Sequence, residues 1–272
     1  MLETVHFISG LPRSGSTLLS ALLRQNPRFH TDITGPLAPM CGAIHHRISG
    51  TGEFSVLFDD ARCAQMLRGL FDSYYAHVPP GHVAFDTNRT WTSRAALLGK
   101  LYPKCRIICC VREIGWIIDS LERMRTKNPL KLSKLFEESV QDTLYKRVEG
   151  LMNSDTGLIG LAWCALREAW FSEAAHRLIV VPYDTLVRQP EKALKRIYQE
   201  LGEPWFPHDF NNVRYEAPAY DNNLGMPGLH TVHPVVEPRE RHAVIPPDLL
   251  TKYDKTHFWA HAELNSGGVL VV

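Results

Sequence analysis

The chain has 272 residues, of which 44% are hydrophobic and 22% are charged. These are the proportions of an ordinary globular protein with a sizeable core, so the fold needs neither disulfides nor a structural metal. The formal net charge of +1 provides no general attraction to nucleic acid or to a membrane surface, and any anionic ligand must therefore be held by local geometry.

Short apolar runs rich in β-branched residues predict buried parallel strands. Three are clear, over residues 5–9, 106–111 and 178–181, and a weaker one covers 82–85. Stretches with the apolar spacing of helices lie between them, over residues 17–25, 61–76, 91–101, 115–125, 130–152, 158–176 and 191–201. Strands that alternate with helices predict the α/β class, with a doubly wound parallel sheet flanked by helices on both faces.

Two stretches depart from this alternation. Helical patterns follow one another without a strand from residue 115 to 176, which predicts a helical insertion packed against one edge of the sheet. Residues 202–247 are rich in Pro, Gly, Asn and His and show no period, which predicts a long loop that could act as a lid. A last amphipathic helix is expected near 247–259. Because no repeat or composition shift marks a boundary, we expect a single domain over residues 1–272.

The cysteines and the N-terminal residues bear on metal binding and compartment. No CxxC pair or Cys/His ligand spacing occurs, so no metal site is expected. Cys105, Cys109 and Cys110 fall in an apolar run, where reduced cysteine acts as a small hydrophobe. The first residues lack the pattern of a signal peptide, and no apolar run reaches the roughly 18 residues of a membrane-spanning helix. We therefore expect a cytoplasmic protein without a membrane partner.

The loop after the first predicted strand is the first candidate site. Gly10 and Gly15 bracket four residues that two hydroxyl residues follow, which is the spacing of a phosphate-binding loop. The backbone N–H groups of such a loop and the open N-terminus of the next helix can hold an oxyanion. A nucleoside triphosphatase carries lysine where this chain has Ser16, and the cation here is Arg13 instead. The alternative is a tight turn that Ser14 caps, but we predict a P-loop-type anion site with the candidate ligands Arg13, Ser14, Gly15, Ser16 and Thr17.

A second candidate anion site follows the strand predicted over 106–111. Arg112 comes directly after this strand, at the edge where open α/β sheets place their ligands. Ser120 lies eight residues further on, about two turns into the next predicted helix. The guanidinium and the hydroxyl could share one phosphate. The alternative is an arginine that pairs with Glu113 or Asp119 at the end of a strand.

Together, these sites resemble the sulfotransferase family that uses 3′-phosphoadenosine 5′-phosphosulfate (PAPS). Residues 12–17, PRSGST, resemble its 5′-phosphosulfate loop. Arg112 followed by Ser120 resembles its 3′-phosphate motif, with the family's spacing. Residues 181–186, VPYDTL, resemble a later segment of the family, in which the tyrosine, here Tyr183, commonly lies beside the nucleotide.

The resemblance extends over about residues 4–201 and more loosely to Trp259. It is closest to bacterial and protein-tyrosine-type members, which also carry arginine in the first loop. It implies a PAPS-dependent sulfotransferase that moves a sulfuryl group in line to a hydroxyl or amine and releases adenosine 3′,5′-bisphosphate (PAP), without a metal. It further implies that Arg13 and its loop hold the transferring group and the 5′-phosphate, while Arg112 and Ser120 hold the 3′-phosphate.

The catalytic base is where the chain departs from the family pattern. Protein-tyrosine-type relatives place a glutamate about twenty residues beyond the first loop, and that position falls at Thr34, which cannot serve as a base. Asp32 lies two residues earlier and is the predicted base, with Asp86 and His30 as alternatives. A carboxylate in such a turn could instead only stabilise the turn.

Two more roles follow from the resemblance. A second catalytic lysine of those relatives falls at Thr87 by simple counting, and Arg89 could substitute for it. Relatives also close a basic segment near the C-terminus over the 3′-phosphate. Here the loop 202–247 would do so, and we assign His233 to nucleotide binding.

Two other functions remain open. A nucleotide kinase-like phosphotransferase would use the same first loop, although serine replaces its lysine and no clear aspartate follows a strand to hold Mg²⁺. A nucleotide-binding or scaffold module that has lost its base would account for Thr34 and Thr87. The expected partners are the nucleotide donor and an acceptor that the sequence does not identify. Nucleic acid is not expected, and a homodimer is left open.

Overall fold

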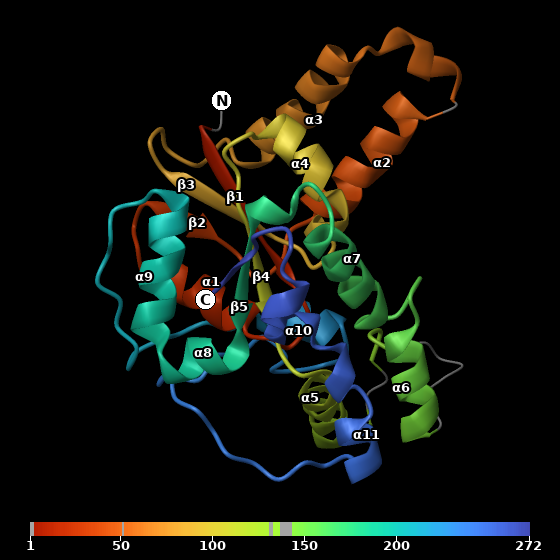
Figure 1. Cartoon of the computed structure of the whole chain (residues 1–272), viewed down its shortest axis with the longest axis vertical. Helices are drawn as coiled ribbons and strands as arrows, with labels where there is room; N and C mark the ends of the chain where they lie inside the picture. Colours follow the sequence, from red (N-terminus) through yellow and green to blue (C-terminus); the bar gives the residue numbers. More distant parts are fainter. Residues whose placement is uncertain (1–2, 51, 131–132, 137–142) are drawn as a thin grey trace.

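The computed structural model describes residues 3–50, 52–130, 133–136 and 143–272. These residues form a six-stranded sheet whose neighbouring strands run parallel, in the order β2-β3-β1-β4-β5-β6 (Figure 1). The predicted parallel α/β sheet is therefore confirmed. No pattern predicted β2 and β6, because strands of three and two residues are too short to show a period. The strands are β1 (Thr4–Gly10), β2 (Phe29–Thr31), β3 (Val83–Thr87), β4 (Ile107–Val111), β5 (Leu178–Pro182) and β6 (Leu270–Val271).

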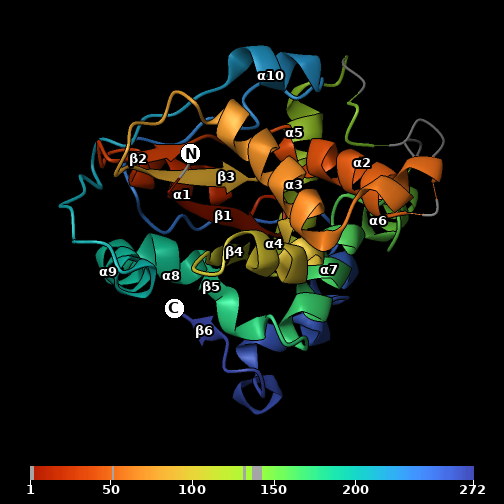
Figure 2. The same ribbon diagram turned by 90° about the horizontal axis from the view of Figure 1, so that it is seen from above.

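Apolar side chains alternate between the two faces of the sheet. Phe7 and Ile107 lie in one core, and their neighbours Ile8 and Ile108 lie in the other. In Figure 2, α8 and α9 lie on one side of the strands, and α3, α4 and α7 lie on the other. The first core is covered by α2 (Leu37–Ser49), α3 (Asp60–Tyr74), α4 (Ala95–Leu101), α5 (Ile114–Lys127) and α7 (Gly160–Trp170). The second core is covered by α1 (Ser16–Leu23), α8 (Tyr183–Arg188) and α9 (Pro190–Leu201).

The stretch from 115 to 176 is helical, but it covers a face of the sheet and not an edge. α5 and α7 share the core of the central strand β1. α6 (Leu144–Met152) is tied to α5 by a buried ion pair between Arg147 Nε and Glu122 Oε1 at 2.7 Å. Of the helix predicted over 130–152, residues 131–132 and 137–142 lie outside the described residues. The helix α2 was not predicted, because Pro39 and Gly42 weaken its helical pattern.

Residues 202–247, here called the late segment, fold back on themselves. Val213 N donates to Pro234 O at 2.8 Å, and α10 (Pro218–Asn223) lies between these two residues. α11 (Pro247–Thr251) then packs on α5. The two helices approach so closely at Gly115 that a Cβ there would lie 2.0 Å from the carbonyl oxygen of Leu250. The helix predicted over 247–259 is thus α11 followed by short 3₁₀ turns.

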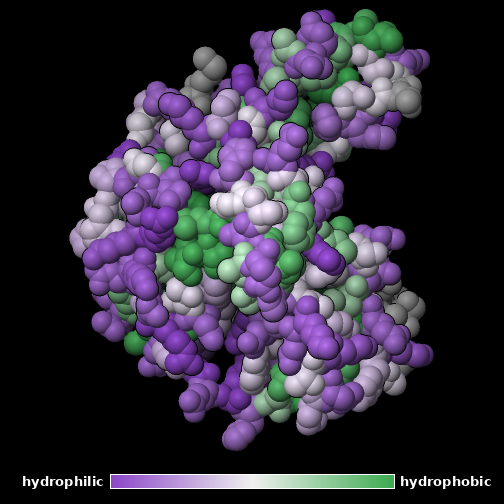
Figure 3. All heavy atoms as spheres, in the orientation of Figure 1, coloured by the Kyte–Doolittle hydropathy of each residue, from purple (hydrophilic) through white to green (hydrophobic). Residues whose placement is uncertain are grey.

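The end of the α2–α3 pair projects from the body of the molecule. Figure 3 shows the surface hollowed below this projection, on the side away from α9. The connection between the two helices carries exposed apolar side chains, of which Val56 is 85% exposed and Phe54 is 62% exposed. Among the described residues, no helix is long and apolar enough to cross a membrane.

Candidate active site

The ends of the parallel strands bring most of the predicted site residues to one edge of the sheet. Arg13 follows β1, Asp32 follows β2, Asp86 lies near the end of β3, Arg112 follows β4 and Tyr183 follows β5. β1 and β4 are neighbours, yet the helices that follow them, α1 and α5, cover opposite faces. Open α/β sheets bind their ligands at such a switch point. The site therefore centres on the junction of β1 and β4.

The loop between β1 and α1 has backbone geometry that only certain residues adopt easily. Gly10 has φ +99°, and a Cβ there would lie 2.2 Å from the carbonyl oxygen of Cys110 on β4. Gly15 has φ +94° and is the N-cap of α1. Arg13 also has a positive φ, of 56°, although it carries a side chain. A left-handed residue of this kind costs roughly 1–2 kcal/mol and is commonly found at functional sites.

The hydroxyl residues of the loop take separate positions. Ser14 is buried, and its Oγ donates to Pro12 O at 3.2 Å. Ser14 therefore does not cap α1, which has no side-chain cap, so the capping role in the alternative interpretation is wrong. Ser16 and Thr17 are half-buried and begin α1, where backbone N–H groups without helical partners are directed outward. They are placed to contact an oxyanion at the helix N-terminus.

Arg112 lies against an aromatic ring and not against a carboxylate. Its guanidinium carbon lies 4.1 Å from the centre of the Tyr183 ring, a cation–π arrangement. Asp119, one of the acids that could have paired with it, is 2.9 Å from Arg241 and 3.6 Å from Arg123. Burial, together with the charge of Arg241, lowers the pKa of Arg112. Within the described residues, no carboxylate lies within ion-pair distance of Arg112.

The first and second candidate sites adjoin one another in the structure. Arg13 Nε donates to Ser120 Oγ at 3.2 Å, although the two residues are 107 positions apart. Burial, and then the charge of Arg112, lower the pKa of Arg13 to about 10. Two guanidinium groups held this close in a low-dielectric environment repel one another, and a bound anion would relieve that repulsion.

The late segment places a third guanidinium near the site, that of Arg241. The residue predicted from this segment was His233. His233 is exposed, and the pKa of its imidazole is lowered by partial burial and by the charges of Arg239 and Lys127. Arg241 instead lies near Arg112, with its guanidinium carbon 5.5 Å from the centre of the Trp116 ring. Its Nε is buried without a hydrogen-bond partner in the described part of the chain.

The late segment also places a buried acid beside Arg13. Asp221 accepts from His230 at two points: the ring Nδ1 lies 2.5 Å from Oδ1, and the backbone N lies 2.9 Å from Oδ2. Leu229 O accepts a hydrogen bond from Arg13 Nη1. Sequence reasoning missed this pair, because nothing in the spacing of Asp221 and His230 marks them as partners.

The three predicted bases have different surroundings. Asp86 is fully buried, accepts from Tyr75 Oη and Trp91 Nε1 at 2.7 Å each, and has a raised pKa because of its burial. Both of its oxygens are therefore engaged in the core. His30 Nε2 lies 2.9 Å from His82 Nδ1, and burial followed by that neighbour lowers its pKa.

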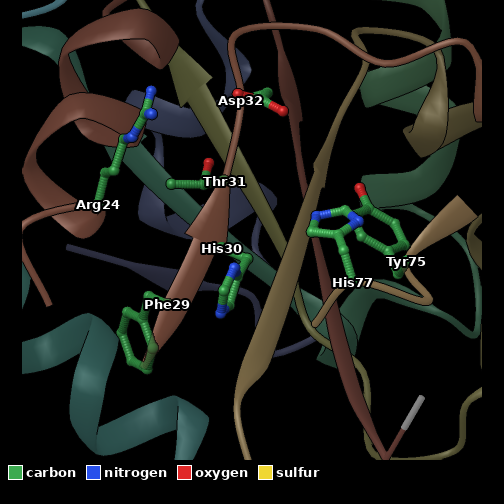
Figure 4. A pocket seen from close by; sticks show the side chains of 7 residues that line it. All are labelled: Arg24, Phe29, His30, Thr31, Asp32, Tyr75 and His77. Atoms are coloured by element: carbon green, nitrogen blue, oxygen red, sulfur yellow. The ribbon is translucent and has the colours of Figure 1, made fainter. Parts of the chain in front are cut away.

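Asp32 lies at the mouth of a cavity of about 160 Å³ beside β2 (Figure 4). The figure shows its carboxylate at the end of the strand, with His30 below it and the rings of Tyr75 and His77 across from them. Asp32 and Asp221 both raise the pKa of Tyr215, which burial raises first. The lining residues of the cavity are Arg24, Phe29, His30, Thr31, Asp32, Tyr75 and His77.

The two residues considered in place of a second catalytic lysine also lie at this edge. Thr87 is buried, and its hydroxyl has no hydrogen-bond partner in the described chain. Arg89 is exposed, and its carbonyl accepts from Ser9 Oγ at 3.0 Å. Of the two, Arg89 alone can present a positive charge to a ligand.

A strand–loop–helix turn with guanidinium groups at the switch point is the arrangement with which α/β proteins hold phosphorylated or sulfated ligands. A sequence model described as "Sulfotransferase family" matches residues 6–207. The chain therefore belongs to the sulfotransferase family.

Two curated relatives give the same family. Protein-tyrosine sulfotransferase 1 of Danio rerio is 25% identical over 206 residues, which cover 73% of this chain and 53% of the relative. Protein-tyrosine sulfotransferase 2 of Gallus gallus is 22% identical over 209 residues, with 73% and 51% covered. The chain thus spans about half the length of the curated relatives it matches.

Solved structures share the fold. The sulfotransferase domain of the Synechococcus PCC 7002 olefin synthase superposes with a TM-score of 0.52 at 20% identity, covering 96% of this chain and 95% of that domain. Mouse sulfotransferase SULT7A1, complexed with PAP, superposes with a TM-score of 0.52 at 16% identity, covering 98% and 88%. At these identities the likeness establishes the sulfotransferase fold.

Proposed function

We propose that this protein transfers a sulfuryl group from PAPS to a hydroxyl or amine acceptor. The observation that carries this proposal is the hydrogen bond from Arg13 to Ser120, which joins the loop after β1 to the site after β4. A donor with a 5′-phosphosulfate and a 3′-phosphate needs two anion sites at a fixed separation. A single phosphate-binding loop would provide only one.

The side chains fit such a donor. Arg13 and Arg112 are half-buried cations without a carboxylate at ion-pair distance in the described chain, and Arg241 Nε is buried without a hydrogen-bond partner there. PAPS supplies an activated sulfuryl group with PAP as the leaving group. Arg13, Ser16 and Thr17 would hold the sulfuryl and 5′-phosphate oxygens, whose charge grows during the transfer.

The 3′-phosphate would lie with Arg112 and Ser120, and Tyr183 would lie beside the nucleotide. A hydrogen bond to a charged group contributes about 1.5–3 kcal/mol, so two such bonds could favour this nucleotide over one without a 3′-phosphate by about 150-fold to roughly ten-thousand-fold.

We also infer a reducing compartment such as the cytoplasm. All six cysteines are free, and Cys109 and Cys110 are fully buried in β4. Burial raises the pKa of both thiols and keeps them protonated. Cell fractionation of the tagged full-length protein tests this inference, and recovery from a secretory compartment would contradict it.

Calorimetric titration with PAP, run beside ATP with Mg²⁺, tests the proposed donor. We expect tight binding of PAP, loss of that binding in Arg112→Ala, and no comparable binding of ATP. Arg196→Ala is the matched control, since Arg196 lies on α9 at the surface and pairs with Glu200. Preference for ATP with Mg²⁺ would support a phosphotransferase, and binding of neither nucleotide would support a scaffold.

A further inference from the structure

Asp221 and His230 form a closely held ionisable pair outside the predicted residues. The Asp221 side chain is 1% exposed, and the His230 side chain is 16% exposed. Both carboxylate oxygens of Asp221 are used to hold His230, one by the ring Nδ1 and one by the backbone N–H. A buried carboxylate that accepts from Nδ1 fixes the tautomer of the ring, so Nε2 is left without a proton and can act as an acceptor.

This pair lies against the loop that follows β1. Arg13 Nη1 donates to Leu229 O, the carbonyl directly before His230, while Arg13 Nε donates to Ser120. One guanidinium therefore joins the first loop, α5 and the residue beside the imidazole. The charged and titratable groups that face His230 are Asp221 and Tyr220 from α10 and Arg13 from the loop; the Tyr220 ring centre is 5.6 Å from that of His230.

The other candidate bases are less well placed for this loop. Both oxygens of Asp86 accept hydrogen bonds inside the core. Asp32 lies at the cavity beside β2, and no hydrogen bond or ion pair in the described structure connects it to Arg13. Position 34, where a glutamate would be expected from the family pattern, is threonine. His230 also lies beyond residues 6–207, so the family match does not assign it a role.

We propose that His230 is the catalytic base of the sulfuryl transfer and that Asp221 is the residue that positions it; this rests on the proposed function. The acceptor O–H bond breaks, and its proton passes to His230 Nε2. As the bond between the acceptor oxygen and sulfur forms, the bond between sulfur and the 5′-phosphate oxygen breaks, and its electron pair leaves with PAP. The imidazolium that results is stabilised by the Asp221 carboxylate.

The protonation state of the imidazole agrees with this role. Burial lowers the pKa of His230, Asp221 raises it again, and Arg13 lowers it further, with a net downward shift. The ring is therefore neutral at neutral pH and gains a proton only as the pH falls below its ordinary range. The transfer rate should decline on the acidic side as this proton is taken up.

The experiment compares two acceptors of different acidity, phenol and 4-nitrophenol, by release of PAP from PAPS. 4-Nitrophenol is largely ionised at mildly alkaline pH and needs no base, whereas phenol keeps its proton. We expect His230→Gln to lose about 100-fold or more in kcat with phenol, since a general base contributes about 10²–10⁴-fold, and far less with 4-nitrophenol. The Kd for PAP should not change. His242→Gln is the matched control, because that side chain is exposed in the same segment.

Asp221→Asn tests the positioning role by the pH profile. Loss of the carboxylate removes the interaction that raises the imidazole pKa, so the acidic limb of the rate with phenol should move to lower pH while the maximal rate falls. An unchanged rate with phenol in His230→Gln, or an equal loss with both phenols, overturns the proposal. So does a wild-type protein that binds PAP but transfers to neither phenol. Failure of the wild type to bind PAP would instead overturn the proposed function.

Discussion

Arg13 Nε and Ser120 Oγ lie 3.2 Å apart across the switch point of the sheet, with Arg13 in the loop after β1 and Ser120 on α5 after β4. The same guanidinium binds Leu229 O in the late segment. Three parts of the chain that are distant in sequence thus meet at one side chain. A ligand that binds Arg13 is therefore expected to affect the contacts of both α5 and the late segment.

The Arg13 side chain lies in the candidate site, while its backbone has an unfavourable positive φ. Arg13→Gly should separate the effect on ligand binding from the effect on stability. Glycine adopts φ 56° without the penalty of roughly 1–2 kcal/mol that a side chain carries, and the repulsion with Arg112 is lost as well. We expect Arg13→Gly to abolish PAP binding in calorimetry while the melting temperature stays the same or rises by a few degrees, at about 2–4 °C per kcal/mol. Arg13→Lys is the comparison that keeps the charge. A large loss of thermal stability in Arg13→Gly would show that this arginine is mainly structural.

Gly10 should be one of the least replaceable residues in the fold. In Gly10→Ala the new Cβ would lie 2.2 Å from Cys110 O at a φ of +99°, so β1 and β4 would have to separate at the site. Gly81→Ala is the matched control, because Gly81 also has a positive φ, of 74°, but nothing lies within 4 Å of the added carbon. In urea unfolding we expect about 1–2 kcal/mol of destabilisation for Gly81→Ala and several kcal/mol for Gly10→Ala. Equal effects would mean that strand separation costs little.

The central fold follows directly from sequence patterns. The strands predicted over 5–9, 106–111 and 178–181 became β1, β4 and β5, because parallel strands buried on both faces are continuous apolar runs. β2 was missed because it has three residues, and α2 because its Pro39 and Gly42 obscure the helical period. The helices between 115 and 176 cover a face of the sheet and not its edge. This placement depends on tertiary packing, which a local sequence pattern does not show.

The sequence also predicts some residues of the candidate site and misses others. Arg13, Arg112 and Ser120 could be predicted because each has a fixed distance from a strand end. Asp221 and His230 could not, because their contact depends on how an aperiodic segment folds back on the sheet. The assignment of His233 to nucleotide binding stays a prediction. Its side chain is exposed, whereas the side chain of Arg241 is half-buried against Trp116.

Two histidines, His6 (buried) and His208 (half-buried), should make the protein less stable in mild acid. Burial, together with the charge of Arg106, lowers the pKa of His6 from 6.5 to about 4, and burial lowers that of His208 to about 4. Between these values the unfolded chain binds protons that the folded chain does not, so the free energy of unfolding falls as the pH falls from 6.5 toward 4. Each group contributes up to about 1.4 kcal/mol per pH unit in this window.

His6→Asn tests the contribution of one of them. His6 Nδ1 accepts from Arg106 N at 3.0 Å, and the asparagine oxygen can take over that bond without titrating. We expect the slope of unfolding free energy against pH, measured with urea between about pH 7 and about pH 4.5, to decrease by about one proton in the variant. An identical slope would mean that His6 is protonated in the folded protein.

Arg241 should contribute to nucleotide affinity through its charge, and Asp119 should oppose it. Asp119 Oδ2 lies 2.9 Å from Arg241, while its Oδ1 accepts from Val244 N at 2.6 Å. We expect Arg241→Ala to weaken PAP binding by about 10- to 150-fold, equivalent to one charged hydrogen bond of about 1.5–3 kcal/mol. Asp119→Asn keeps an oxygen for Val244 N but removes the negative charge, so it should strengthen PAP binding, and more so at low salt.

The control for these two variants is Arg239→Ala, which removes an exposed arginine of the same segment that pairs with Glu237 at 3.3 Å. Its Kd for PAP should equal that of the wild type, so a uniform weakening in both arginine variants would reveal only a long-range effect of net charge. Opposite shifts in Arg241→Ala and Asp119→Asn, beside an unchanged Arg239→Ala, would place the nucleotide against Arg241. If Asp119→Asn weakens binding instead, Asp119 acts mainly by orienting Arg241, and the guanidinium reaches the ligand only while that ion pair is intact.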